Sequence, residues 1–261
     1  MLTSAQLAHR LREAVAAACA AGQLARSYLA DPSRLAVAFK GPQDVLTAAD
    51  GAVERMIVAR LSSAFPGDAF LGEEGTGIAG DRCWVIDPID GTANFARGLP
   101  DWCVSIALVV GGRVDLGVIF DPGHDLLYTA RRGEGARCND RPIGVSATTD
   151  IRRARVDAGY SGRVAIDDFT GLLRRLLTAG ATVTQCGSAA LGLARVADGR
   201  LDGYVERHLF AWDVLAGLLL VEEAGGCVNP FLGGDGFTTG NKAIAATRAL
   251  YPALAAALDP P

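Results

Sequence analysis

Apolar residues near the start of the chain recur at helical spacing. One face of a helix there would carry Leu7, Leu11, Val15 and Ala18. The apolar stretch at 14–21 also resembles the hydrophobic region of a signal peptide, but Glu13 interrupts its start. We therefore predict an amphipathic N-terminal helix.

The rest of the first half combines one more helix with short β-rich runs. A break at Asp31-Pro32-Ser33 precedes a second amphipathic helix, predicted over 50–64. Gly111-Gly112 joins two β-rich runs and is typical of a two-residue hairpin loop. The predicted strands cover 35–40, 69–72, 83–87, 104–110, 113–120 and 126–130. We expect the last three to form an antiparallel meander.

From about residue 151 strand-like and helix-like runs alternate, which is typical of α/β structure. The predicted strands cover 154–158, 182–185, 201–206 and 243–247, and the predicted helices cover 167–179, 188–197, 250–258 and a segment from Asp213 to Gly225-Gly226. We therefore expect an α+β subdomain over 1–150 packed on an α/β subdomain over 151–261. Polar ligands should bind at their junction.

Composition excludes several other classes of protein. The hydrophobic fraction of 50 % supports an ordinary core, and a net charge of -4 gives no electrostatic basis for nucleic-acid binding. The six cysteines show no C-x-x-C spacing, so we interpret them as reduced thiols. No apolar run approaches the ~20 residues of a membrane span. A cytoplasmic protein without nucleic-acid or membrane partners is expected.

The most informative segment runs from Trp84 to Thr92. An apolar strand delivers Asp87 at its end, Pro88 imposes an extended turn, and Asp90 follows three residues later, so both carboxylates can meet one ion. Gly91 permits close backbone approach, and a helix beginning at Thr92 would offer free amides to a phosphate. Carboxylates beside an anion site repel the anion unless cations intervene. Magnesium prefers oxygen ligands and would bridge these carboxylates to a phosphate. The simpler alternative is that the segment is only a polar turn.

Three further segments carry acids at similar positions. Glu73 and Glu74 follow an apolar strand, so one of them can point inward. Asp213 opens an apolar helix, and the simpler alternative to a metal ligand is that it is just the N-cap of this helix. Asp50 ends the segment that begins at Lys40, and the simpler alternative for this segment is a capping turn before a helix.

Together these segments resemble the inositol monophosphatase family, within the lithium-sensitive, metal-dependent phosphatase superfamily that includes fructose-1,6-bisphosphatases. The resemblance extends from Lys40 to Thr247. Its motifs are Gly72-Glu73-Glu74, Asp87-Pro-Ile-Asp90-Gly-Thr92, Asn94-Phe95, Tyr128 to Ala136 with Asn139, and Trp212-Asp213-x-x-Ala216-Gly217. It implies a layered α-β-α-β-α sandwich and commonly a homodimer.

The resemblance also implies the site. One Mg²⁺ would be bound by Glu73, Asp87 and the Ile89 carbonyl. A second Mg²⁺ would be bound by Asp87, Asp90 and Asp213. A third ion would lie near Glu73. Thr92 and Asp50 would orient and deprotonate the attacking water, so that Thr92, Asp50 and Glu73 form the catalytic group. The amides of Gly91 and Thr92 would bind phosphate, and Lys40 matches a family lysine near the site.

The implied reaction is Mg²⁺-dependent hydrolysis of a small phosphorylated metabolite, foremost inositol monophosphate. Glu206 matches the family carboxylate that accepts hydrogen bonds from inositol hydroxyls, and Ala189 belongs to a substrate-contacting turn. A carboxylate would equally accept the ammonium of histidinol phosphate. A bisphosphorylated substrate, either 3'-phosphoadenosine 5'-phosphate or fructose 1,6-bisphosphate, would need a basic subsite, with Arg97, Arg163, Arg207 and His208 as candidates. A metal-bound scaffold or regulatory module is the non-enzymatic alternative.

Overall fold

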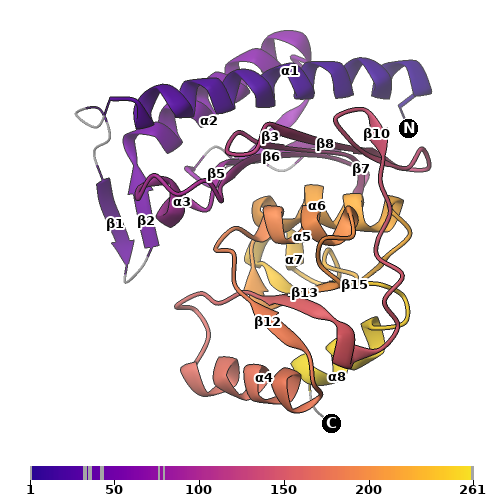
Figure 1. Cartoon of the computed structure of the whole chain (residues 1–261). Helices are drawn as coiled ribbons and strands as arrows, with labels where there is room; N and C mark the ends of the chain where they lie inside the picture. Colours follow the sequence, from indigo (N-terminus) through magenta and orange to yellow (C-terminus); the bar gives the residue numbers. More distant parts are fainter. Residues whose placement is uncertain are drawn as a thin grey trace.

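The structure is a computed structural model that describes residues 2–31, 34, 37–41, 44–75, 77–78 and 80–259. Five layers follow one another (Figure 1): two N-terminal helices, a large sheet, a central pair of helices, a smaller sheet and an outer pair of helices. The layered α-β-α-β-α arrangement expected from the sequence is confirmed.

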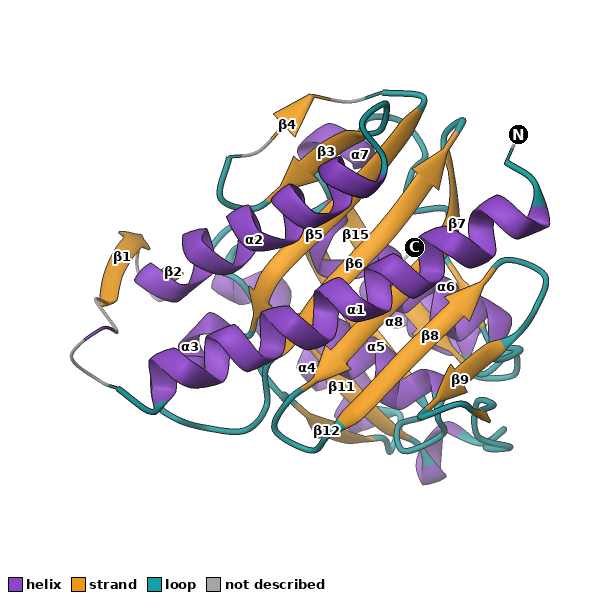
Figure 2. Cartoon of the chain, turned by 90° about the horizontal axis from the view of Figure 1, so that it is seen from above, coloured by secondary structure: helices purple, strands orange, loops and turns teal. Residues whose placement is uncertain are grey.

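The first layer consists of helices α1 (Ser4–Leu29) and α2 (Ala48–Ala64), which lie across one face of the large sheet (Figure 2). Thr3 and Gln6 cap the start of α1 with reciprocal hydrogen bonds. The face of α1 that is fully buried carries Ala14, Ala17, Ala18, Ala21 and Ala25. The larger Leu7, Leu11 and Val15 pack at its margin. Small side chains therefore set how closely this helix approaches its neighbours.

The large sheet has eight strands in the order β10-β9-β8-β7-β6-β5-β3-β4. Their bounds are β3 Ala69–Gly72, β4 Gly77–Ile78, β5 Arg82–Asp90, β6 Cys103–Val110, β7 Arg113–Asp121, β8 Leu126–Arg131, β9 Ala136–Cys138 and β10 Arg141–Pro142. The predicted hairpin is confirmed, since Val110 pairs with Arg113 across Gly111 and Gly112, both at positive φ. Strand β5 runs parallel to β3 and antiparallel to β6. A separate two-stranded ribbon joins β1 (Val37–Gly41) to β2 (Asp44–Thr47).

The smaller sheet has the order β12-β11-β13-β15-β14. Its strands are β11 Arg155–Ala158, β12 Thr182–Thr184, β13 Gly203–Leu209, β14 Cys227–Val228 and β15 Asn241–Ala246. Strand β11 runs parallel to both β12 and β13, as the alternation of strands and helices predicts. The remaining helices are α3 Thr92–Phe95, a 3₁₀ turn at Ile151–Arg153, α4 Ile166–Thr178, α5 Ala189–Ala197, α6 Ala211–Glu223, α7 Gly236–Thr239 and α8 Tyr251–Leu258.

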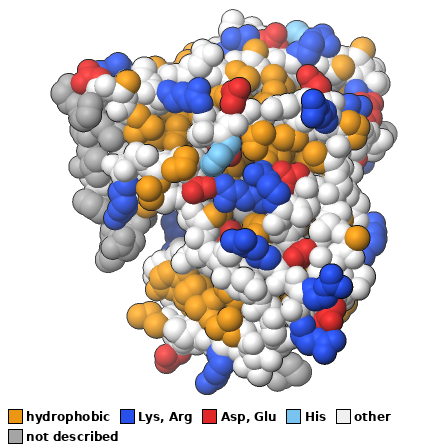
Figure 3. All heavy atoms as spheres, viewed as in Figure 1, with side chains coloured by type: hydrophobic (Ala, Val, Ile, Leu, Met, Phe, Trp, Pro, Cys, Tyr) orange, Lys and Arg blue, Asp and Glu red, His pale blue; other side chains and the backbone are white. Residues whose placement is uncertain are grey.

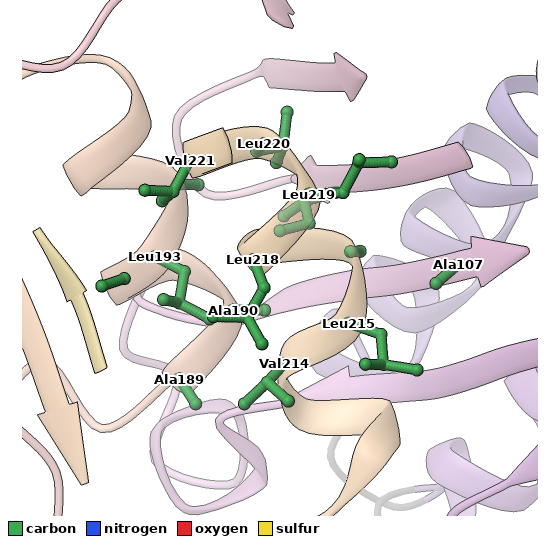
Figure 4. Packing of buried hydrophobic residues seen from close by; sticks show 14 of the residues in the cluster. Ala107, Ala189, Ala190, Leu193, Val214, Leu215, Leu218, Leu219, Leu220 and Val221 are labelled. Atoms are coloured by element: carbon green, nitrogen blue, oxygen red, sulfur yellow. The ribbon is translucent and has the colours of Figure 1, made fainter. Parts of the chain in front are cut away.

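The main core lies where α5 and α6 pack between the two sheets. Figure 4 shows Leu193 of α5 near Leu218 and Val221 of α6, with Ala107 on the adjoining strand of the large sheet. Both helices are apolar on almost every side because a sheet covers each of them from above and below. This shared core joins the two halves of the chain. The division near residue 150 into two subdomains stays a prediction.

Two local predictions need correction. Strand β5 does not end at Asp87 but continues through Pro88 to Asp90, because a bulge accommodates the missing proline amide. Helix α6 begins at Ala211, so Asp213 lies in its first turn and does not open it. All six cysteines are free, which agrees with reduced thiols.

The surface shows no broad separation of charge on the face seen in Figure 3. There, basic side chains lie beside acidic and hydrophobic ones. Among the residues that the structure describes, no helix is both long and apolar enough to cross a membrane.

Candidate active site

A cleft between the two sheets collects most of the acids singled out by the sequence. Its walls come from the ends of β3 and β5, the turn into α3, the loops before α4 and α5, strand β13 and the start of α6. The lining includes Glu73, Asp87, Ile89, Asp90, Gly91, Thr92, Ala93, Asp157, Gly159, Tyr160, Ser161, Arg163, Gln185, Cys186, Gly187, Ser188, Ala189, Tyr204, Glu206, Leu209 and Asp213. All five predicted metal-binding residues thus face one cavity, as do Ala189 and Glu206.

A bulge in β5 brings Asp87 and Asp90 to the same cavity. Residues three apart on a regular strand point to opposite faces. Here Asp87 pairs with Ser105 and Asp90 pairs with Cys103, so three steps on β5 match two on β6. The extra residue re-aims the second side chain. The strand itself is buried along nearly its whole length, which fixes the bulge in place.

Hydrogen bonds hold one oxygen of each central aspartate. Asp87 Oδ1 accepts from the Ile89 amide at 3.0 Å, and Asp213 Oδ2 accepts from the Phe210 amide at 2.7 Å. Asp90 Oδ2 accepts from Ser188 Oγ and from the Ala190 amide, both at 2.6 Å. These bonds engage Oδ1 of Asp87, Oδ2 of Asp90 and Oδ2 of Asp213 and so orient the three carboxylates.

Burial and mutual repulsion raise the pKa of these acids. Burial is the larger cause for Asp87, followed by the charges of Glu73, Asp90 and Asp213. Burial also raises the pKa of Asp213, again with repulsion from Asp90 and Glu73. The pKa of Asp90 rises to about 6 through burial, although the bonds from Ser188 and Ala190 lower it. The cluster therefore favours either protons or added cations.

The donor set fits magnesium in its chemistry. Carboxylates and a backbone carbonyl are the oxygen ligands that Mg²⁺ prefers. Ile89 O accepts from Thr92 Oγ1 at 2.8 Å and retains a second lone pair. Among the described residues no three acidic side chains yet meet at one ligating point. The match to magnesium therefore rests on the oxygen atoms that line the cleft and on the repulsion between its carboxylates. It does not rest on a complete set of ligands around one point.

Asp50 lies behind Thr92 and not in the cleft wall. It is buried at the start of α2, where Oδ2 accepts from the amide and hydroxyl of Thr47 at 2.8 and 2.5 Å. Asp50 Oδ1 lies 3.3 Å from Thr92 Oγ1. Burial raises the pKa of Asp50 while the Thr47 bonds lower it, so the carboxylate is a stronger proton acceptor than an exposed one.

Gly91 shapes the turn between Asp90 and α3. Its φ of 93° is left-handed. A Cβ at this position would lie 2.8 Å from Asp101 O and 3.3 Å from Gly187 O. The first helical hydrogen bonds run from Asn94 and Phe95 to Gly91 O, so the amides of residues 91–93 precede the helical ladder. Phosphate binding by the amides of Gly91 and Thr92 stays a prediction.

The wall of the cleft around Glu206 contains residues that sequence reasoning missed. Asp157, Gly159 and Tyr204 line it beside Glu206. Tyr204 had a usable signal, because it lies two residues before Glu206 on the same face of a strand. Asp157 had none, since only the parallel pairing of β11 with β13 places it beside Tyr204.

The four basic candidates separate clearly. Arg163 lines the cleft, with its guanidinium 4.6 Å from the centroid of the Phe210 ring. The other three are not among the described lining residues of the cleft, and each contacts a backbone carbonyl: Arg97 that of Ala93, Arg207 that of Leu258 and His208 that of Thr239. Lys40 belongs to β1, but its side chain lies outside the described structure.

The fold of two stacked sheets and its similarity to solved IMPase structures define a class, the phosphatases that hydrolyse phosphate monoesters. More specifically, the chain belongs to the inositol monophosphatase family, whose model matches residues 6–260. The family expected from the sequence is confirmed, together with its enzyme class, the phosphoric monoester hydrolases.

Several relatives resemble the chain along almost its full length. An inositol-1-monophosphatase of Mesorhizobium japonicum is 40 % identical over 252 residues, 95 % of each chain. A protein of Pseudomonas aeruginosa named Nus factor SuhB is 38 % identical over 259 residues, 96 % of each. The structure of the extragenic suppressor protein SuhB of Bartonella henselae has a TM-score of 0.89 at 38 % identity, covering 95 % of this chain and 98 % of that one. The structure of an IMPase of Thermotoga maritima has a TM-score of 0.86 at 32 % sequence identity, covering 96 % of this chain and 97 % of that one.

Proposed function

We propose that the protein hydrolyses a small phosphate monoester, with inositol monophosphate as the leading substrate, in a magnesium-dependent reaction. The observation that carries the proposal is the convergence of Glu73, Asp87, Asp90 and Asp213 on one cleft beside the turn that begins α3. Burial and mutual repulsion raise the pKa of Asp87, Asp90 and Asp213 despite the protein hydrogen bonds to Asp90 and Asp213, which supports a role for added cations. A phosphate would enter such a cleft only with cations present.

The proposed ligands are those that the family resemblance implies. One magnesium ion would be held by Glu73, Asp87 and Ile89 O. A second would be held by Asp87, Asp90 and Asp213, and a third ion would lie near Glu73. Bound magnesium supplies the positive charge that activates a water and stabilises the leaving oxygen. Hydrogen bonds to one oxygen each of Asp87, Asp90 and Asp213 would help to orient these carboxylates for the ions.

Thr92 and Asp50 are the proposed proton route. Thr92 Oγ1 donates to Ile89 O at 2.8 Å and lies 3.3 Å from Asp50 Oδ1. A hydroxyl carries only one proton, so rotation of Thr92 toward Asp50 would free its lone pairs for a water proton. The amides of Gly91 and Thr92 would hold the phosphate. We assign Lys40 a supporting role near the phosphate on the basis of the resemblance alone.

The charge of the substrate side favours a neutral or cationic alcohol over a second phosphate. Asp157 and Glu206 are both buried in this wall. Of the four basic candidates, Arg163 alone is among the described lining residues. Inositol monophosphate fits this environment through its hydroxyls. Histidinol phosphate remains the second candidate because its ammonium would pair with Glu206.

Phosphate release from inositol monophosphate, with magnesium and after chelation, tests the proposal. We expect magnesium-dependent turnover that calcium inhibits, because the looser coordination of calcium does not preserve the in-line geometry. A panel with histidinol phosphate and fructose 1,6-bisphosphate would rank the substrates by kcat/KM. Full activity after chelation would exclude the metal assignment, and inactivity on every ester would favour a scaffold role.

We further propose a cytoplasmic homodimer, as the family resemblance implies. Light scattering at micromolar concentration measures the dimer directly. A monomer under those conditions would contradict this part of the proposal without affecting the reaction.

A further inference from the structure

Tyr204 and Glu206 form a hydrogen-bonded pair in the wall of the cleft. They lie two residues apart on β13, so both side chains project from the same face of the sheet. The Tyr204 hydroxyl donates to Glu206 Oε2 at 2.6 Å. Their exposed fractions are 2 % and 5 %. A buried bond to a carboxylate at this distance fixes the position of Glu206.

Gly159 makes room for this pair. Strand β11 ends at Ala158, which pairs with Val205 between the two residues. A Cβ on Gly159 would lie 1.9 Å from Glu206 Oε2 and 2.7 Å from the Tyr204 hydroxyl. Any side chain here would displace the carboxylate, the phenol or both. The Gly159 amide also donates to Val205 O at 3.0 Å, so the backbone cannot retreat without losing that bond.

Helix α5 also approaches the ring of Tyr204 closely. A Cβ on Gly192 of α5 would lie 2.6 Å from a carbon of this ring. The side chain of Tyr204 therefore has close neighbours on α5 and at the end of β11. Its hydroxyl donates the hydrogen bond that holds Glu206 on the same strand. In the described structure Tyr204 engages one carboxylate oxygen of Glu206, and Oε1 is the oxygen that remains for a ligand.

The charges around Glu206 do not hold it in place by themselves. The acids Asp90, Asp157 and Asp213 repel it, and Arg163 attracts it. Repulsion from three elements would push a loosely held carboxylate away from the cleft. The hydrogen bond from Tyr204 opposes this displacement.

We propose that Tyr204 and Gly159 are positioning residues that hold Glu206 for the substrate alcohol and so set substrate preference, without contacting phosphate or metal. The inference rests on the proposed function for its assay. It predicts a selective effect. Substrates whose alcohol reaches Glu206 depend on the pair, and esters with a featureless leaving group do not.

The test compares inositol monophosphate with p-nitrophenyl phosphate. Tyr204→Phe removes the donor and keeps the ring, and it should lower kcat/KM for inositol monophosphate roughly ten-fold. Gly159→Ala should lower it by roughly ten- to a hundred-fold, because its methyl group displaces the carboxylate. Turnover of p-nitrophenyl phosphate should fall by a clearly smaller factor in both variants, because its leaving group has no hydroxyl for Glu206 to bind.

Two controls separate positioning from general damage. Tyr128 is a matched control, because it is also buried and its hydroxyl donates to a carboxylate, that of Asp198 at 2.9 Å. Tyr128→Phe should leave the substrate preference unchanged. In a Glu206→Gln background, Tyr204→Phe should add little further loss, because both changes act through one side chain.

Equal losses on both esters, or full additivity with Glu206→Gln, would overturn the proposal. Wild-type enzyme that hydrolyses only p-nitrophenyl phosphate would instead contradict inositol monophosphate as substrate. The positioning role is then decided by a crystal structure of Tyr204→Phe, in which Glu206 must have moved. An unmoved Glu206 would overturn the proposal whatever the substrate.

Discussion

Single carboxylates in the cleft are oriented by hydrogen bonds from the protein. Asp90 shows this most clearly, since Ser188 and the Ala190 amide at the start of α5 both donate to Oδ2. These bonds orient the side chain and lower its pKa, yet burial still raises that pKa to about 6. The protein therefore fixes the geometry of Asp90 without neutralising its charge, as a cation ligand requires.

Asp90→Asn or Asp213→Asn should lower kcat by orders of magnitude at saturating magnesium. Each change removes a charged ligand while keeping the size of the side chain. Magnesium should also raise the melting temperature less than it does for wild type, which thermal unfolding measures without relying on activity. Asp121→Asn is the control, because Asp121 is buried and bound to His124 outside the cleft lining. Near-wild-type turnover in Asp90→Asn or Asp213→Asn would refute the ligand assignment.

At the scale of elements, the site depends on contact between the turn after β5 and the loop before α5. Asn94 of α3 joins them, since its Nδ2 donates to Asp101 O at 2.7 Å and to Cys186 O at 2.8 Å. The same loop carries Ser188, which holds Asp90. One amide side chain thus connects the first half of the chain to the second at the active site.

Asn94→Ala should reduce both stability and kcat. Two partly buried carbonyls would lose their donor, at a cost of about 1–3 kcal/mol in the free energy of unfolding. Denaturant unfolding measures this loss, and turnover of p-nitrophenyl phosphate measures the effect on the metal site. Asn139→Ala is a matched control, because Asn139 also bonds two backbone groups, Leu127 N and Asp125 O, in a surface loop. If the two variants keep equal activity, the coupling across the cleft is unimportant.

At the scale of the whole molecule, the fold concentrates negative charge where its two halves meet. A carboxyl group whose pKa is higher in the folded chain binds its proton more tightly there than in the unfolded chain. Its contribution to stability is therefore lost as the pH rises from the ordinary pKa to the folded one. This window extends from 3.8 to about 6 for Asp90 and from 4.5 to about 7 for Glu206.

The metal-free protein should therefore melt at a lower temperature near pH 8 than near pH 5.5, and magnesium should stabilise it more at the higher pH. Cations replace the protons that the acids have lost. Calorimetry at the two pH values, with chelator and with magnesium, measures both effects. A magnesium-induced shift that is equal at the two pH values would show that these acids do not bind the ion.

The sequence by itself determined the order and type of most elements. Helical periodicity predicted α1 and α2, and Gly111-Gly112 predicted the β6–β7 hairpin, because these are local properties of the backbone. The motifs identified the family and the acids that line the cleft. The roles of those acids as metal ligands stay predictions.

Only the tertiary structure decided how these residues meet. Alternation along a strand would separate Asp87 from Asp90, and the bulge against β6 reverses that. The sequence placed Glu206 at the end of a strand, whereas pairing of β11 with β13 buries it beside Tyr204 and Gly159. The buried face of α1 is likewise its alanine face, selected by the elements beneath it. Such pairings join residues far apart in the chain, and local patterns carry no information about which distant strand supplies the neighbour.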